Sequence, residues 1–214
     1  MRTPSAIRIW LLLAPSALIC SGCPLIAWVV AQFAPPQKVD AVYKPPKDKK
    51  VLVFVDDIRY PVPYEPIKAE LTDRLNRIIK EQKVAAETVP YDKVVDLIAA
   101  TPNFNQLHVP DVGKRLKADL VLYVEIIRFA LKESDTSPLW EGQLQVSVKW
   151  VDPTGRIWPK ERPDGYQLET VSLPAVENTS PGYGTEVARM LAEQTADQVS
   201  KLFYDHTIPA DQMK

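Results

Sequence analysis

Acidic residues follow the first strongly apolar run of the chain, in a pattern that can bind a divalent cation. Asp56 and Asp57 come directly after the run 51–55, and Glu125 lies in a second apolar run that can form the neighbouring strand. Open α/β sheets bind ligands at the carboxyl ends of their strands, and Mg²⁺ prefers carboxylate ligands. Aspartate at a strand end is also ordinary turn chemistry. No Ser, Thr or Lys at a recognisable spacing completes a phosphoryl-transfer set, so we expect no metal here and keep a cation-dependent enzyme as the alternative.

The remaining reactive side chains form no recognisable catalytic or cofactor-binding set. His108 precedes a Val-Pro pair, His206 follows the last predicted helix, and the serines lack a G-x-S-x-G motif. The seven glycines form neither of the common phosphate-binding motifs. Both cysteines lie in the N-terminal apolar segment, which excludes a closed four-ligand zinc site built with the two histidines. We therefore predict no catalytic residue, no bound metal and no cofactor.

The N-terminal segment has the composition of an export signal. Two arginines, Arg2 and Arg8, precede an uncharged and largely apolar stretch that reaches residue 37. Within it, Ser21-Gly22-Cys23 resembles the bacterial lipobox, in which small residues precede an acylated cysteine; Cys20 stands where that pattern has leucine. The resemblance implies a lipoprotein-type signal peptide over 1–23 and lipid attachment, for instance of palmitate, at Cys23. It also implies a bacterial protein anchored in the cell envelope and facing the periplasm.

Two alternatives account for the same apolar stretch. An uncleaved transmembrane helix needs about 20 apolar residues, and a conventionally cleaved signal would release a soluble protein. Pro15 and Pro24 interrupt the run, and the small residues around Cys23 lie in its middle, which suits a cleavage site better than a continuous span. All three versions place the folded part outside the cytoplasm.

The rest of the chain divides into a tether, one domain and a tail. Residues 24–49 are rich in Pro and Lys and predict a spacer, 50–206 predict a globular domain, and 207–214 a C-terminal tail. Hydrophobic residues make up 46% and charged residues 25%, which is ordinary globular usage and excludes a disordered chain. The formal charge of -1 offers no footprint for nucleic acid. No cysteine follows Cys23, so the domain must be stabilised by its core without disulfides.

Hydrophobic periodicity predicts the elements of this domain. Strands are expected at 51–56, 84–89, 120–131, 143–150, 156–158 and 166–172, and helices at 65–82, 92–100, 110–117 and 183–204. Glu70 and Arg74, spaced four apart, are expected to pair on the outer face of the first helix. The order β-α-β-α-α-β-β-β(-β)-α predicts an α/β fold: a single three-layer-like domain with a mixed β-sheet packed by helices.

This order resembles a group of bacterial envelope domains. Three stretches carry the resemblance: the strand 51–56 with the helix after it; Ala118-Asp119 before the strand 120–125; and the hairpin 148–158 around Asp152 and Thr154-Gly155. They are similar to the penicillin-binding-protein activator lipoprotein B, the curli secretion lipoprotein and the N-terminal domain of the Tol β-propeller protein. The family usually has Gly one residue after the strand run, where this chain has Glu125.

The resemblance implies a non-catalytic domain that binds or regulates other envelope proteins, with no nucleic acid or small-molecule substrate. A structural subunit of a secretion or outer-membrane assembly is the alternative from the same group. Aromatic residues anchor many interfaces, and the candidates here are Tyr60, Tyr64, Trp140 and Trp158. For the two tryptophans, packing in the core is favoured over a place at an interface. One strand has polar and mostly uncharged residues on one face, which are Gln143, Gln145, Ser147 and Lys149. They predict a docking face beside these tryptophans, and the alternative is that the last helix covers this face.

Overall fold

The computed structural model describes residues 37–64, 66–134 and 136–209. The chain separates into two compact units: one spans 40–205, and the other joins the residues up to 39 with those from 206 onward. In the second unit, β1 (Gln37–Val39) pairs antiparallel with β11 (His206–Ile208). Cys20, Cys23 and the whole predicted signal peptide lie outside the described residues.

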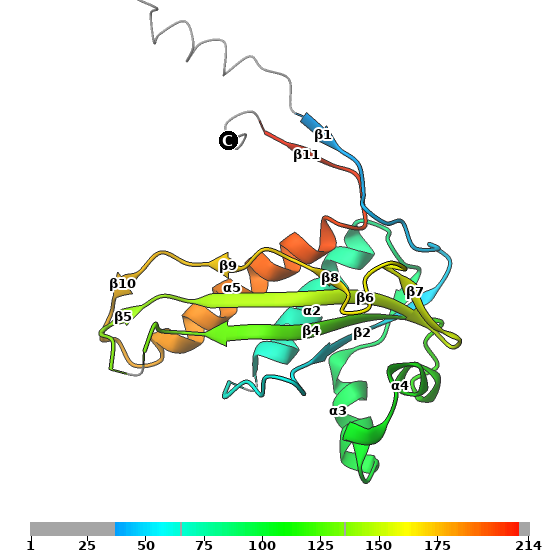
Figure 1. The fold of residues 1–214 in the computed structure, drawn as a ribbon, viewed down its shortest axis with the longest axis horizontal. Helices are drawn as coiled ribbons and strands as arrows, with labels where there is room; N and C mark the ends of the chain where they lie inside the picture. The colour runs from blue at the N-terminus through cyan, green and yellow to red at the C-terminus, as the bar shows by residue number, and fades with distance from the viewer. Residues whose placement is uncertain (1–36, 65, 135, 210–214) are drawn as a thin grey trace, which may run out of the picture. The chain divides into compact units, whose positions relative to one another are not determined.

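A mixed sheet forms the centre of the unit 40–205 (Figure 1). Its strands are ordered β3-β2-β4-β6-β7, and β8 and β9 also pair with β6. The three strands β2, β3 and β4 are parallel, and β4 and β6 are antiparallel. The bounds are β2 (Lys50–Asp56), β3 (Glu87–Thr88), β4 (Leu120–Ala130), β6 (Gln143–Asp152), β7 (Gly155–Trp158), β8 (Tyr166–Gln167) and β9 (Val171–Ser172).

Helices α2 (Pro66–Glu81) and α5 (Tyr183–Ser200) cover one face of this sheet (Figure 1). The alternate residues Val51, Val53 and Val55 of β2 point to this face, and Val146, Val148 and Trp150 of β6 join them in one continuous core with both helices. Apolar residues recur at every second position in the strands and about every 3.6 residues in the helices, so each element has one apolar side. These apolar sides meet in one layer.

A smaller second core covers the start of the opposite face. Here α3 (Tyr91–Ala100) and α4 (Val109–Arg115), with a short 3₁₀ turn (Phe104–Gln106) between them, pack on Leu52, Phe54 and Val121. The parallel strands β2 and β4 are therefore buried on both faces at their amino ends, which explains their unbroken apolar runs. The three-layer arrangement predicted from the sequence is present, and the α/β fold class is confirmed.

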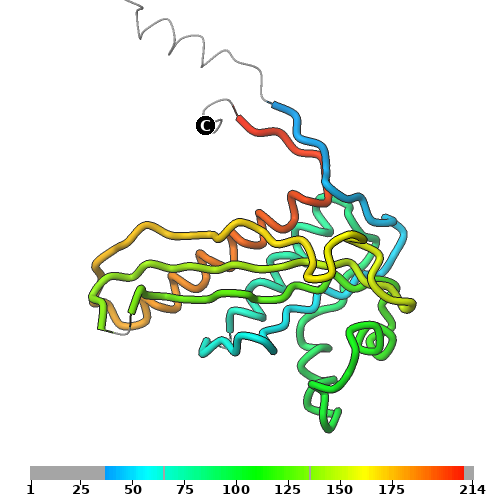
Figure 2. The backbone as a smooth tube through the Cα atoms, viewed as in Figure 1, coloured from blue at the N-terminus to red at the C-terminus, as the bar shows by residue number. Residues whose placement is uncertain are grey.

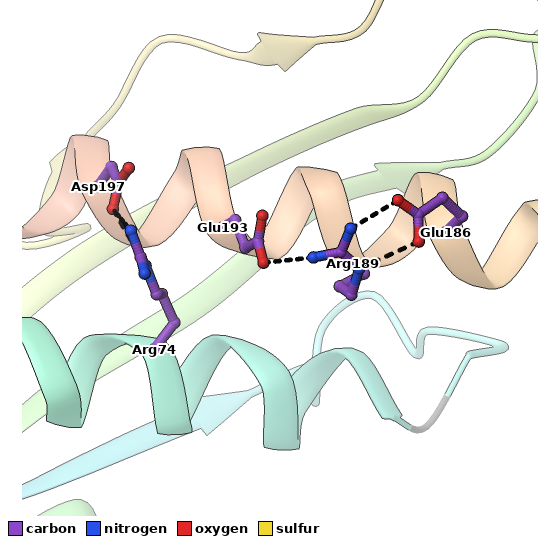
Figure 3. Close-up of polar contacts among 5 residues, drawn as sticks. All are labelled: Arg74, Glu186, Arg189, Glu193 and Asp197. Atoms are coloured by element: carbon purple, nitrogen blue, oxygen red, sulfur yellow. Dashed lines mark hydrogen bonds and ion pairs between the residues drawn. The ribbon is translucent and has the colours of Figure 1, made fainter.

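The two helices of the larger core are also linked by charged residues at their outer edge. Arg74 of α2 donates to the Oδ1 atom of Asp197 of α5 at 3.0 Å, and Arg189 contacts both Glu186 and Glu193 within α5 (Figure 3). The predicted pair of Glu70 with Arg74 is wrong, because Arg74 reaches across to the neighbouring helix. Burial raises the pKa of Glu70, whose Oε2 atom has no hydrogen-bond partner among the described residues.

Most predicted elements are confirmed, and their boundaries differ by a few residues. The predicted strand over 166–172 is two short strands, β8 and β9, and the last helix ends at Ser200. A further small pair, β5 (Leu139–Trp140) with β10 (Val176–Glu177), was not predicted because each strand has only two residues. Residues 40–49, for which the sequence predicts a tether, belong to the compact unit: Tyr43 donates its N–H to Leu202 and stacks on Trp158.

Candidate functional site

The three candidate carboxylates, Asp56, Asp57 and Glu125, do not all share one face of the sheet. Asp56 and Glu125 are opposite one another in the parallel ladder of β2 and β4, as expected from the sequence. Asp57 is bound elsewhere, because its Oδ2 accepts the N–H of Val62 and its Oδ1 lies 3.2 Å from the ammonium of Lys68. The three carboxylates therefore do not converge on one point.

The two carboxylates that do share a face are already bound by protein groups. Glu125 has a side chain only 6% exposed; its Oε1 lies 2.9 Å from Arg59, and its Oε2 lies 3.7 Å from the ammonium of Lys149. Asp56 accepts a 2.7 Å hydrogen bond from the hydroxyl of Tyr123. We call these five residues the Glu125 network. Its two acidic and two basic side chains have equal and opposite charge, and such pairing offsets the free-energy cost of burying the Glu125 charge.

No group of three His, Cys, Asp or Glu side chains in the described ranges is close enough to hold a metal ion. His108 is exposed at the start of α4, and His206 lies in β11. The arrangement of the Glu125 network instead links the loop after β2, through Arg59, to the middle of the sheet. Its physical effect is to hold that loop in place.

The Tyr123 hydroxyl makes the network sensitive to high pH. Burial raises the pKa of Tyr123, and the hydrogen bond to Asp56 and the charge of that carboxylate raise it further. A tyrosine whose pKa is higher in the folded than in the unfolded chain contributes stability that is complete below about pH 10 and is lost as the pH rises. We expect Tyr123→Phe to reduce the loss of unfolding free energy between pH 9 and pH 11.

Urea unfolding at each pH, followed by circular dichroism, measures this loss. Tyr43→Phe is the matched comparison, because burial also raises the pKa of Tyr43 but its ring lies in the aromatic core on the other face. An identical pH slope for wild type and Tyr123→Phe would contradict the proposed contribution of the hydroxyl.

The predicted polar docking face is only partly open. Ser147 is 1% exposed, because its hydroxyl donates to the carbonyl of Asp164 and the backbone of Gly165 lies against it. A Cβ at Gly165 would overlap the Ser147 hydroxyl, so this close approach requires glycine. The ammonium of Lys149 forms an ion pair with the carboxylate of Glu125. The prediction that Ser147 and Lys149 form an open face is therefore wrong.

The two candidate tryptophans have different environments. Trp158 is half-buried against the main core, where it stacks on Tyr43 and Tyr166 and meets Phe203 edge to face. Trp140 is half-buried: its Nε1 donates to the carbonyl of Asn178, and the ammonium of Lys132 lies 4.3 Å from the centre of its ring. Tyr64, the fourth aromatic candidate, packs against the main core.

Two adjoining hollows lie between the loop after β2 and the second half of β4. One has a volume of about 390 Å³ and the other about 460 Å³, and both are lined by Pro63 and Phe129. We call the combined depression the β4 groove. Its other lining residues are Tyr60, Pro61, Val62, Ile127, Arg128 and Gln145 in the first hollow, and Ala130, Leu131, Lys132 and Trp140 in the second.

The β4 groove includes some residues that sequence reasoning selected and others that it missed. Tyr60, Trp140 and Gln145 were candidates, whereas Phe129, Arg128 and the two loop prolines were not. The spacing Tyr60-Pro61-Val62-Pro63, directly after a strand, was a usable signal for a stiff loop. Nothing in the sequence placed that loop beside residues 127–131, because this contact depends on β2 ending before β4.

No family model and no curated protein matches this chain. Among solved structures it is similar to the PelC dodecamer from Paraburkholderia phytofirmans, with 10% identity, a TM-score of 0.41, and coverage of 79% of this chain and 97% of that one. It is also similar to lipoprotein GNA1162 from Neisseria meningitidis, with 12% identity, a TM-score of 0.37, and coverage of 69% and 98%.

A third similar structure is the uncharacterized lipoprotein B from Nitrosomonas europaea, with 10% identity, a TM-score of 0.33, and coverage of 76% of this chain and 84% of that one. Two of these three structures are described as lipoproteins. At such identities and TM-scores the likeness bears on neither partners nor activity.

Proposed function

We propose that this chain is a lipid-anchored protein of the bacterial cell envelope, whose domain faces the periplasm and binds another envelope protein without catalysing a reaction. The anchor is supported by the arginines, the apolar stretch and Ser21-Gly22-Cys23 at the N-terminus. Within 37–64, 66–134 and 136–209, no helix has both the length and the apolarity to cross a membrane.

Lipid attachment is tested at the predicted cysteine. We expect Cys23→Ser to lose metabolic labelling by a fatty acid and to leave the membrane fraction, because the acylated sulfur is removed. Cys20→Ser is the matched control and should be labelled like the wild type. Unchanged labelling of Cys23→Ser would contradict the assignment, and loss of label in Cys20→Ser alone would move it to Cys20.

The β4 groove is the observation that carries the binding role. Three aromatic side chains, Tyr60, Phe129 and Trp140, lie along it, and aromatic and arginine residues supply most of the binding energy at protein interfaces. Tyr60 is 54% exposed, and Arg128 is also exposed. An exposed aromatic beside an apolar depression is the usual composition of a docking site.

The absence of catalysis is supported by the state of the carboxylates. Asp56 is occupied by the Tyr123 hydroxyl, and Glu125 by Arg59 and Lys149. A general base or metal ligand needs a free lone pair directed at the reacting group. In the Glu125 network these lone pairs are directed at protein donors, which favours a structural role for the network.

The binding role is tested with substitutions in the groove. Envelopes that carry the full chain are treated with a short cross-linker, and proteins joined to it are identified. We expect Tyr60→Ser and Arg128→Glu each to lose the main cross-linked partner of the wild type, with an unchanged circular dichroism spectrum. Val95→Ser is the control, because Val95 is similarly exposed at 45% but lies on α3. Recovery of the same partner with both groove variants would overturn this function.

A further inference from the structure

The second half of β4 has an open edge. The pairing of β2 with β4 begins where Val51 lies opposite Leu120 and ends where Asp56 lies opposite Glu125. Asp56 is the last residue of β2. β4 continues to Ala130 and pairs with β6 on its other side. In the part of the chain that the structure describes, no strand pairs with residues 126–130 on the side that β2 has left. Figure 2 follows β4 and β6 beyond the end of β2.

The loop that runs past this edge does not close it. Two interactions hold this loop in position: the N–H of Val62 donates to Asp57, and Arg59 forms an ion pair with Glu125. A hollow of about 390 Å³ is lined by the loop on one side and by β4 on the other. Pro61 and Pro63 have no N–H and so cannot donate to a neighbouring strand. The loop therefore lines the β4 groove without pairing with the strand edge.

The charges of the groove select the kind of chain that fits. The residues that line its two hollows include two charged side chains, Arg128 and Lys132, and both are basic. A bulge lies between Ile126 and Arg128, a feature that redirects side chains at strand edges. Phe129, Trp140 and the prolines add apolar surface. An extended segment with alternating acidic and apolar residues complements both properties.

We propose that the partner binds by strand addition: an extended segment of it pairs with the open edge of β4 over residues 126–130. Its carboxylates face Arg128 and its apolar side chains contact Phe129 and Trp140. This inference rests on the proposed function and adds the mode of binding and the chemistry of the segment. Main-chain hydrogen bonds give such complexes their affinity, and the side-chain contacts give them specificity.

The test uses hydrogen–deuterium exchange on the full chain in detergent micelles. The probe is an acetylated, amidated octapeptide that alternates valine and glutamate, and the control peptide alternates valine and lysine. We expect the valine–glutamate peptide to slow amide exchange in residues 126–131 by about tenfold or more, because strand pairing protects main-chain amides. The valine–lysine peptide should leave exchange unchanged.

Two variants test the charge preference. In Arg128→Glu, protection by the valine–glutamate peptide should be lost and the valine–lysine peptide should protect instead. Arg77→Glu, on the exposed side of α2, makes the same change of charge away from the groove and should behave like the wild type. Equal protection by both peptides, or by neither, would overturn the proposal. So would protection that needs no peptide and grows with protein concentration, since a second copy would then occupy the edge.

The two proposals fail in different ways. If neither peptide protects β4 while Tyr60→Ser and Arg128→Glu still lose their cross-linked partner, strand addition is wrong and the groove keeps its binding role. If those variants keep the partner, the proposed function itself is wrong, whatever the peptides do.

Discussion

Replacing Trp150 with alanine is expected to lower the free energy of unfolding by about 3–5 kcal/mol, the range measured for removal of buried large aromatic side chains. Trp150 is fully buried on β6. The centre of its ring lies 5.3 Å from the ring centre of Phe203 and 6.4 Å from that of Tyr43. Three separate parts of the chain meet at this ring, so a cavity there cannot be filled by the shift of one neighbour.

Two further variants separate the causes of this loss. The Nε1 atom of Trp150 is buried with no hydrogen-bond partner among the described residues, so Trp150→Phe removes volume but breaks no hydrogen bond and should cost about 1–2 kcal/mol. Trp140→Ala, at a half-buried tryptophan, is the matched control. Urea unfolding of each full-length variant, followed by circular dichroism, gives the three values. A Trp150→Ala effect no larger than that of Trp140→Ala would contradict this description of the core.

Removal of the Glu125 carboxylate is expected to destabilise the domain by about 3 kcal/mol, because it leaves a poorly solvated lysine without its counter-charge. The Lys149 side chain is 16% exposed, and its ammonium lies 5.7 Å from the centre of the Tyr123 ring. Arg59, the other partner of Glu125, is 59% exposed and keeps its hydration when the carboxylate is lost. The cost of Glu125→Ala should therefore come mainly from Lys149.

A double variant tests this cause. Glu125→Met with Lys149→Met removes both buried charges and should recover most of the lost stability, because apolar residues of similar size replace such pairs at little cost. Arg59→Ala should cost less than about 1 kcal/mol, as expected for an exposed ion pair. Urea unfolding at pH 7 measures all three. If Arg59→Ala and Glu125→Ala destabilise equally, or if the double variant is as unstable as Glu125→Ala, the buried lysine is not the cause.

The order of the elements could be predicted from periodicity because each long element carries its own signal. The alternation of Leu144, Val146 and Val148 with polar residues identifies β6, and the run 51–55 identifies a strand buried on both faces. Two-residue strands such as β5 and β10 bury too little surface to leave a pattern. The bulge after Ile126 likewise has no sequence signature, because it results from a mismatch between two paired strands.

The candidate site was only partly predictable. The sequence predicted that Asp56 and Glu125 lie on neighbouring strands, and this is confirmed by their register in β2 and β4. Their partners were missed, because Arg59 and Lys149 reach Glu125 from a loop and from another strand. Asp56 and Glu125, which the sequence offered as an alternative cation site, are part of an ion-pair and hydrogen-bond network in the folded domain.

By itself, the sequence determined the α/β class and the order of the main elements. These properties are local, since each follows from the residue types within one segment. Only the tertiary structure decided that Ser147 is covered and that the edge of β4 is left open beside Tyr60. The physical reason is that exposure and pairing depend on where the neighbouring strand ends and which loop passes beside it, and contacts between distant segments leave no periodic signal in either of them.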